Sequence, residues 1–380
     1  MSPELNNLTL NRSKGKRKPV YQQVVQYLKN AIETNNIGTG QHLQTVAEFA
    51  NNLKVGYSTI DTAFDVLEQD GLISRNTKRG KGPIVLGCNK GTINFTRWRG
   101  CAIFISMAEG IEEYARENKI KVVITDAMQN SKRYLDMISH APNDADGLIL
   151  FPWDSPEYHS AVADAVKSGT RIVFIDRIIS NMDLSSVSID HFGGAYQATR
   201  HLIETHSSPV YYVGYTDKPS SANQRYKGWL EAMKQYRRDL EYQNFVCEFF
   251  KSEAETAAMP DDEWIQPGCD KIVDLFKTKP QEKYCFFTCN DDAAVLIYKA
   301  AQKQGLEIGK DVFIASFGDN PYCKNLAVPL TSVSQFDREV GYEAAKLLHY
   351  EIKGICKHSM HKILPAKLNI RQSSTGKISI

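Results

Sequence analysis

Cys289-Asn290-Asp291-Asp292-Ala293 is the stretch that decides the fold, because it directly follows the apolar, β-rich run Tyr284–Thr288. Asp319 likewise comes shortly after a second apolar run, Val312–Ser316. Gln335 comes shortly after a third stretch, Pro329–Val333. In an open α/β sheet the carboxyl ends of parallel strands face the ligand crevice. We therefore expect Asn290, Asp319 and Gln335 to converge on one cleft. Amide and carboxylate groups hydrogen-bond hydroxyls in fixed directions, which favours a small polyol such as a sugar.

Composition is that of an ordinary globular protein with room for two or three domains. The chain has 380 residues, of which 42% are hydrophobic and 24% charged. No apolar run approaches the roughly 20 residues of a membrane helix, and the polar, basic N-terminus lacks a signal core. These features predict a cytoplasmic protein without membrane contact. The eight cysteines form no Cys-x-x-Cys pair and no zinc-type spacing, so we expect reduced structural thiols, no metal and no cofactor.

Charge is distributed unevenly along the chain. Residues 1–90 carry 12 Lys/Arg and 7 Asp/Glu, a net charge of +5. The remaining residues carry 34 Lys/Arg and 37 Asp/Glu, a net charge of −3. A basic module on a mildly acidic body suggests nucleic-acid contact at the N-terminal end. Within it, residues 1–18 are expected to form a flexible arm, whose basic run Arg12–Lys18 would neutralise phosphates. The alternative is a solvated tail without a partner.

Residues 19–87 have the pattern of a small helical domain. Apolar residues recur every three or four positions after Val20, which predicts a first helix. Thr45 and Glu48 form a capping-box pattern that opens a second helix. A short turn separates it from a third helix, which we expect Ser58 to cap.

Two short apolar runs at 72–74 and 83–86 indicate strands around a basic turn at 78–82. Three helices followed by such a wing predict a winged helix-turn-helix, with the third helix in the major groove of DNA. The residues expected to face base edges are Tyr57, Ser58, Thr59 and Asp61, and those expected to meet phosphates are Lys54, Lys78, Arg79 and Lys81. The alternative is a helical bundle without a DNA-binding role.

This domain resembles the DNA-binding domain of GntR-type regulators. The similar stretches are Pro19–Val24, Ile37–Leu43 and Leu67–Ile73. The chain departs from the family pattern at the positions where members of the family usually contact DNA. Gln44–Ala47 replace the usual Pro-Ser-Glu-Arg, and Gly56-Tyr57 replace the usual Ser-Arg. Two arginines expected to contact DNA are therefore absent, and the resemblance implies the fold but not the operator sequence.

Beyond a linker at 88–91, residues 92–380 are expected to form one two-lobed body. Apolar strands such as Gly147–Phe151 and Arg171–Ile175 alternate with helical stretches, and a second set begins at Val210. Strand-helix alternation predicts parallel sheets covered on both faces. The predicted fold class is therefore α/β, with two similar lobes and a cleft between them.

The body resembles the periplasmic-binding-protein-like, sugar-sensing domain of LacI-type regulators. The similar stretches are Phe174–Arg177, Asn290–Ala293, Phe317–Asp319, Pro329–Gln335 and Leu368–Ser374. A GntR-type domain on a LacI-type body is similar to the chimeric arabinose and fucose regulators of bacteria. The resemblance implies ligand contacts from Asp176, Arg177, Arg225, Asn290, Asp319 and Gln335.

Each of these residues also has a structural interpretation. Asp176 and Asn290 are suited to capping a helix. Arg177 and Arg225 could each pair with a carboxylate. Asp319 could be a turn residue, and Gln335 could be a surface residue.

The loop after the first strand of the body has two interpretations. If Thr92–Thr96 is the strand, Arg97-Trp98-Arg99 form the loop, and we favour this register because it leaves room for a full helix. Trp98 would then stack on the apolar face of a sugar, and Arg97 or Arg99 would bind its hydroxyls. In the alternative register Cys101–Ile105 is the strand. Trp98 could also pack at the domain junction.

The sequence favours a switch over an enzyme. It has no nucleophile elbow, phosphate loop or metal constellation. We predict a DNA-binding repressor that works as a homodimer on a palindromic operator. The expected effector is a monosaccharide, either a pentose or a deoxyhexose such as arabinose or fucose. The alternatives are a phosphorylated or acidic sugar, or a protein partner.

Overall fold

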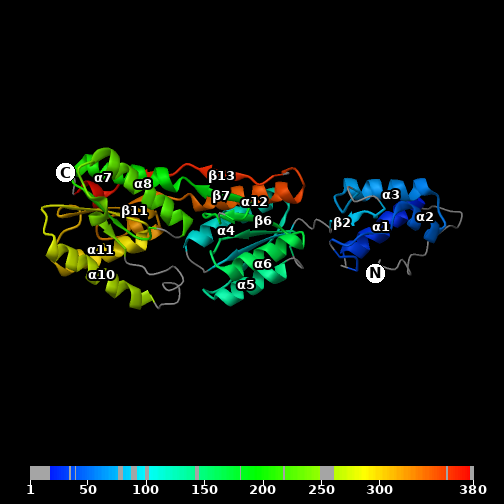
Figure 1. The fold of residues 1–380 in the computed structure, drawn as a ribbon, viewed down its shortest axis with the longest axis horizontal. Helices are drawn as coiled ribbons and strands as arrows, with labels where there is room; N and C mark the ends of the chain where they lie inside the picture. Colours follow the sequence, from blue (N-terminus) through cyan, green and yellow to red (C-terminus); the bar gives the residue numbers. More distant parts are fainter. Residues whose placement is uncertain are drawn as a thin grey trace.

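The structure is a computed structural model, and Figure 1 shows an N-terminal domain followed by a two-lobed body. It describes residues 18–33, 36–38, 40–75, 80–86, 92–98, 102–141, 145–179, 181–216, 219–248, 261–356 and 358–376. Residues 1–17 of the expected arm at 1–18, and the whole of the expected linker at 88–91, lie outside these ranges. Within them, no helix is long and apolar enough to cross a membrane.

The N-terminal domain has the predicted three helices and two-stranded wing. Its elements are α1 (Val20–Glu33), α2 (Val46–Leu53), α3 (Tyr57–Gln69), β1 (Ile73–Ser74) and β2 (Ile84–Val85), with β1 and β2 antiparallel. The capping box of Thr45 and Glu48 is confirmed. The expectation that Ser58 caps α3 is wrong, because the helix already begins at Tyr57 and Gly56 is its N-cap. The core includes an edge-to-face contact of Phe49 and Phe64, with ring centroids 5.4 Å apart.

Lobe one is built on a parallel sheet with the strand order β13-β7-β6-β5-β3-β4. Its elements are β3 (Thr92–Arg97), α4 (Ala102–Asn118), β4 (Lys121–Asp126), α5 (Ser131–His140), β5 (Gly147–Leu150), α6 (Pro156–Lys167), β6 (Arg171–Ile175), β7 (Ser185–Ile189), α12 (Asp337–Ile352) and β13 (His361–Leu364). The favoured register of the first strand is confirmed, since Ala102 already begins a helix. Helices α4 and α12 approach closely: a Cβ at Gly110 would lie 1.9 Å from the carbonyl oxygen of Arg338, so only glycine fits there.

Lobe two repeats this plan with the strand order β14-β12-β11-β10-β8-β9, in which only β14 is antiparallel to its neighbour. Its elements are α7 (His191–His206), β8 (Val210–Val213), α8 (Ser220–Tyr236), η2 (Tyr242–Phe245), β9 (Val246–Cys247), α10 (Asp261–Thr278), β10 (Tyr284–Thr288), α11 (Asp291–Lys303), β11 (Val312–Gly318), η3 (Pro321–Lys324), β12 (Thr331–Ser334), β14 (Lys367–Asn369) and α13 (Gln372–Thr375). The predicted strands after Val210 and before Asn290 are therefore confirmed.

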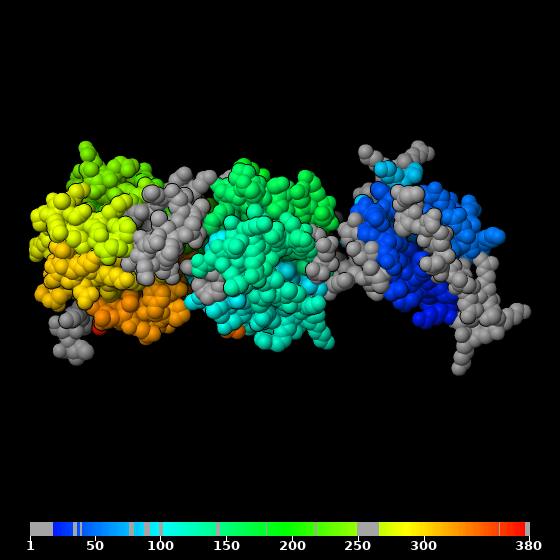
Figure 2. All heavy atoms as spheres, turned by 90° about the horizontal axis from the view of Figure 1, so that it is seen from below, coloured from blue at the N-terminus to red at the C-terminus, as the bar shows by residue number. Residues whose placement is uncertain are grey.

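The chain passes between the lobes three times, from β7 to α7, from β12 to α12 and from β13 to β14. The first two passages leave the carboxyl ends of parallel strands, so the carboxyl ends of both sheets face the boundary between the lobes. Figure 2 shows the two lobes side by side, with the N-terminal domain at one end of the molecule. Side chains that follow the strands of either sheet can therefore meet at this boundary.

Candidate functional site

A buried cluster of polar side chains joins the two lobes at this boundary. Arg225 of α8 donates from Nη1 to the carbonyl oxygen of Cys289 (2.6 Å) and from Nη2 to Oε1 of Gln335 (3.0 Å). Its Nη2 also lies 3.9 Å from Oδ1 of Asp176, which follows β6 in lobe one. The guanidinium stacks on Phe317, 4.0 Å from the ring centroid. Asp176, Arg225 and Gln335, which the sequence assigns to the site, are thus brought together.

His191, at the start of α7, connects Arg225 with Asp176. Arg225 Nε donates to Nδ1 of His191 (3.3 Å), so the imidazole proton must lie on Nε2, which faces both the backbone oxygen (3.0 Å) and Oδ1 (3.3 Å) of Asp176. Burial opposes ionisation of Asp176. The interaction with His191 and the charges of Arg225 and Arg177 outweigh burial and hold the pKa of Asp176 well below its usual range. The cluster therefore places an ionised carboxylate beside the Arg225 guanidinium, whose own pKa is lowered by burial while the charge of Asp176 opposes that shift.

The backbone is strained at three places along this boundary. Asp176, Asp319 and Phe336 adopt positive φ angles of 65°, 55° and 48°, a conformation that side chains other than glycine rarely take. Each residue follows the carboxyl end of a strand, respectively β6, β11 and β12. Such strain concentrates at functional sites, where the surrounding structure holds it in place.

Asp337 adds a second carboxyl group to the cluster. Its Oδ1 is buried and makes no hydrogen bond within the described ranges of the chain. Burial, followed by the negative charge of Asp176, raises the pKa of Asp337 well above its usual value, although Arg225 opposes the shift. Ionising Asp337 therefore costs free energy in the folded protein.

We expect Asp337→Asn to raise the stability of the protein relative to wild type as the pH rises from 4 to 8. At about pH 4, both proteins hold a neutral group at this position and should be about equally stable. As the pH rises from about 4 toward the raised pKa, the wild type loses stability because Asp337 ionises in the unfolded chain while it stays protonated in the folded protein, and the variant has no such group. Chemical unfolding between pH 4 and pH 8 measures this difference. Glu339→Gln, a change in an exposed neighbour, is the control, and a constant difference across the range would contradict the account.

The other predicted ligand residues are engaged in contacts of their own. Asn290 Oδ1 accepts from the amide of Ala293 (2.9 Å) and so caps α11. The carboxylate of Asp319 is 2.6 Å from Arg371 Nη2 and accepts from Asn369 Nδ2 (2.8 Å). Arg97 Nε pairs with Asp126 (2.9 Å) and Arg177 Nε lies 3.5 Å from Asp176, while Arg99 lies outside the described residues.

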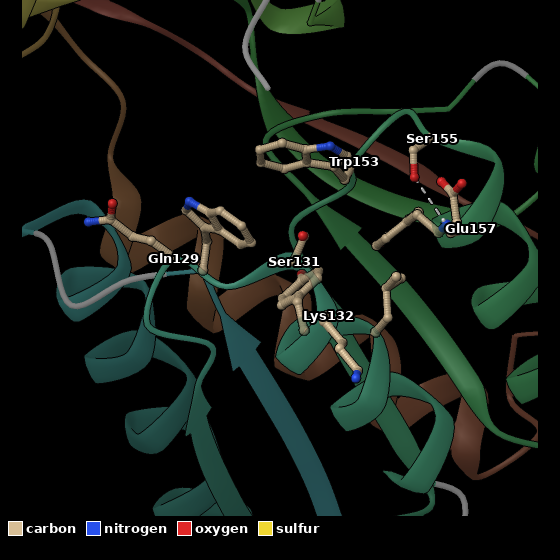
Figure 3. Close-up of a pocket in the computed structure, with 10 residues that line it drawn as sticks. Gln129, Ser131, Lys132, Trp153, Ser155 and Glu157 are labelled. Carbon is tan, nitrogen blue, oxygen red and sulfur yellow. Dashed lines mark hydrogen bonds between the residues drawn. The ribbon is translucent and has the colours of Figure 1, made fainter. Parts of the chain in front are cut away.

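A pocket of about 410 Å³ opens in lobe one at the carboxyl ends of β3, β4 and β5. It is lined by Trp98, Gln129, Ser131, Lys132, Tyr134, Leu135, Trp153, Ser155, Glu157 and Tyr158. Trp98 packs on Trp153 with ring centroids 4.7 Å apart. In Figure 3, Gln129 stands on one side of the pocket and Ser155 with Glu157 on the other. Trp98 therefore lines a cavity, as a ligand-stacking role requires.

The predicted DNA-contacting face lies at the start of α3. Tyr57 and Ser58 are exposed there and Thr59 is half-buried, while Lys54 and Lys81 are exposed nearby. Lys78 and Arg79 lie outside the described residues.

Asp61 has a structural partner in the same domain. Arg75, which follows β1, lies 3.1 Å from carboxylate oxygens of both Asp61 and Asp65, and 3.8 Å from Glu68. This contact favours a structural role for Asp61, because Arg75 neutralises the acidic side of α3.

Sequence reasoning missed His191, Asp291 and Trp153. His191 comes two residues after the end of β7, and Trp153 comes three residues after the end of β5. Their positions after strands could have marked them as candidates. Asp291 could be assigned only to the start of a helix, because its partners Ser316 and Ser332 are distant in sequence.

Two family models match parts of the chain. Residues 20–82 match the gntR family of bacterial regulatory proteins, and residues 199–374 match the periplasmic binding protein-like domain. The arabinose metabolism transcriptional repressor of Geobacillus stearothermophilus is 23% identical over 363 residues, which cover 92% of this chain and 95% of that protein. Catabolite control protein A of Priestia megaterium is 24% identical over 274 residues, which cover 71% of this chain and 77% of that protein.

Solved structures share the fold of the body. The transcription regulator CcpA of Lactococcus lactis superimposes with a TM-score of 0.63 at 18% identity, covering 74% of this chain and 98% of that one. The regulator CelR in complex with cellobiose superimposes with a TM-score of 0.63 at 18% identity, covering 94% of this chain and 100% of that one. The chain thus joins a gntR-family DNA-binding domain to a periplasmic-binding-protein-like body, the architecture of a bacterial transcription regulator.

Proposed function

We propose that the protein is a repressor of transcription that releases DNA when a saccharide binds between the two lobes. The observation that carries this proposal is the buried cluster of Asp176, His191, Arg225 and Gln335, which joins the lobes at the carboxyl ends of both sheets. Its carboxylate, guanidinium and amide groups suit the hydroxyls of a sugar ring. The effector ring is a pentose or a deoxyhexose, and no catalytic step is involved.

The chemistry of relatives supports a saccharide. Relatives include a ribose operon repressor of Haemophilus influenzae, and solved structures of the same fold contain ribose and cellobiose. A ligand that contacts residues of both lobes favours the closed arrangement, because each lobe then contributes binding free energy. The three passages between the lobes are the segments at which such closure would bend.

The DNA-bound form is a homodimer in this proposal. A two-fold dimer presents two copies of α3 to a palindromic operator, so that closure of the lobes changes the spacing of the two N-terminal domains. DNA affinity then falls by the coupling free energy between the two sites, which is typically about 1–3 kcal/mol.

We expect Arg75→Gln to weaken DNA binding by about tenfold. Removing Arg75 leaves Asp61, Asp65 and Glu68 without their shared cation, and three unneutralised carboxylates on α3 repel phosphates. Fluorescence anisotropy with a labelled duplex at several salt concentrations measures the change. Arg200→Gln is the matched control, because Arg200 forms an exposed pair with Glu204 in lobe two and its loss changes net charge equally. Equal losses in both variants would contradict a local effect of Arg75.

A thermal-shift screen against saccharides tests the proposed effector class. The panel contains pentoses, deoxyhexoses, uronic acids, sugar phosphates and disaccharides. A bound ligand raises the unfolding temperature progressively as its concentration exceeds the dissociation constant. We expect neutral sugars to give the shift. A shift with sugar phosphates alone would replace the neutral effector by a charged one, and a blank screen would overturn the saccharide proposal.

A further inference from the structure

The outward face of α3 begins with an exposed aromatic side chain. The helix packs on the core of the N-terminal domain through four buried side chains, Ile60, Ala63, Phe64 and Leu67. Tyr57, its first residue, is 60% exposed, and the neighbouring Ser58 is exposed as well. Figure 1 shows α3 along one edge of the N-terminal domain. An aromatic ring and a hydroxyl group are therefore the first side-chain groups that this end of the helix presents to a partner.

The charges of α3 limit how it can read DNA. Residues 57–69 contain the acidic residues Asp61, Asp65 and Glu68, but neither lysine nor arginine. A bidentate arginine or lysine is the commonest specific contact to guanine in the major groove. Arg75 is already bound to the acidic side of the helix, since its Nη1 donates to Asp61 Oδ1 (3.1 Å) and its Nη2 to the Asp61 backbone oxygen (2.5 Å). The side chains of α3 must therefore recognise bases by a different chemistry.

The space beside Tyr57 is open to an approaching base pair. Gly56 precedes Tyr57 as the N-cap of α3 and contributes no side-chain hydrogen bond. A Cβ atom placed at Gly56 would come no closer than 3.7 Å to another side chain, that of Thr59. In helix-turn-helix proteins, the N-terminal residues of the recognition helix are the ones that contact base edges. The ring of Tyr57 therefore stands, unobstructed by its neighbours, at the position from which bases are read.

A thymine methyl group matches the exposed ring of Tyr57. Among the four bases, only thymine presents an apolar group, its C5 methyl, at the edge of the major groove. Apolar and aromatic side chains contact this methyl group, whereas serine hydroxyls bond to base edges of either kind. A tyrosine ring combines an apolar face with a polar tip that can stay in water. The start of α3 therefore carries the groups that suit an A·T base pair.

We propose that α3 selects an A·T base pair in each half-site of the operator by packing the Tyr57 ring on the thymine methyl group. The Ser58 hydroxyl bonds to the base edge beside it. The inference rests on the proposed binding to operator DNA and specifies a base that this DNA contains. Lys54 and Lys81, which are exposed nearby, contact phosphates and so add affinity without a preference for sequence.

A uracil scan of the bound duplex tests the methyl contact. The full wild-type chain selects a duplex from a random library, and each thymine is then replaced in turn by uracil, which removes only the C5 methyl group. We expect one thymine in each half-site at which this replacement weakens binding about fourfold, the effect of losing one buried methyl group. In Tyr57→Ala the same replacement should change affinity by less than about 1.5-fold, because the ring is gone. Tyr57→Phe should keep the fourfold effect, because the ring remains.

Library selection with Tyr57→Arg gives an independent readout. This substitution introduces a guanidinium that can bind guanine in a bidentate manner, so the variant should enrich G·C at the position where wild type enriches A·T. Circular dichroism checks that the Tyr57 variants are folded, as the exposure of this side chain leads us to expect. Gln69→Ala is the control, because Gln69 is exposed at the opposite end of α3. It should retain both the DNA affinity and the uracil effect of wild type.

The outcomes separate this inference from the proposed function. If wild type selects a duplex in which no thymine responds to uracil, the methyl contact is wrong and the DNA-binding function stands. If Tyr57→Ala keeps the full uracil effect, another side chain contacts the methyl group and the inference fails. Enrichment of the same base by wild type and by Tyr57→Arg would also contradict it. If wild type selects no duplex at all, both proposals fail.

Discussion

Replacing Asp291 by alanine is expected to destabilise lobe two by roughly 4 kcal/mol, because several buried donors lose their acceptor together. Asp291 is fully buried. Its Oδ1 accepts from the hydroxyls of Ser316 (2.7 Å) and Ser332 (2.6 Å), and its Oδ2 accepts from the amide (2.8 Å) and side chain (2.9 Å) of Asn320. These bonds join the start of α11 to β11, β12 and η3. Burial raises the pKa of Asp291, and the hydrogen bonds oppose that shift.

Urea unfolding of wild type and variant gives the loss of stability directly. The neighbouring Asp292 is a matched control, since its carboxylate accepts from the Tyr322 hydroxyl (2.8 Å) and it is only half-buried. Asp292→Ala should cost about 1 kcal/mol. If both substitutions lower the free energy of unfolding by about the same amount, the four hydrogen bonds of Asp291 would stabilise the lobe no more than the single hydrogen bond of Asp292.

Replacing Arg225 by methionine is expected to weaken saccharide binding at least about 100-fold, which corresponds to about 2.7 kcal/mol. Arg225 contacts Asp176 of lobe one and several polar groups of lobe two, namely those of Cys289, Gln335 and His191. Its loss therefore removes the side chain that links the polar residues of the two lobes. It also leaves the buried Asp176 carboxylate with one cation fewer, which lowers stability by about 3 kcal/mol. DNA binding should persist, because the N-terminal domain has its own core.

Arg238→Met provides the comparison for this variant. Arg238 is exposed on lobe two and its replacement changes net charge by the same amount. It should leave saccharide affinity unchanged. Because Arg225→Met is also destabilised, binding is measured at a temperature where circular dichroism shows both proteins folded. Full retention of saccharide binding by a folded Arg225→Met protein would remove the cluster from the site.

Much of the fold could be predicted because its signals are local. The capping box of Thr45 and Glu48, the strand before Asn290 and the helix after Arg97 each depend on neighbouring residues and their periodicity. Gly56 could not be identified as the cap of α3, since it makes no side-chain hydrogen bond and Ser58 was the stronger candidate by residue type.

The candidate site was less predictable because its partners are distant in sequence. Asp319 pairs with Arg371, which β14 brings alongside β12. Arg225 meets Gln335 across 110 positions of the chain. The position after a strand identifies which side chains face the boundary between the lobes. It does not say which of them already bind one another.

The most direct test of the central claim is a DNA-release titration. A labelled duplex selected from a random library is bound by wild type or Arg225→Met, and the best saccharide from the thermal-shift screen is added while anisotropy is followed. The account predicts that the saccharide lowers the DNA affinity of wild type by at least about fivefold and leaves that of Arg225→Met unchanged. A saccharide that binds wild type without altering its DNA affinity, or that releases both proteins equally, would contradict control of DNA binding through the Asp176–Arg225 cluster.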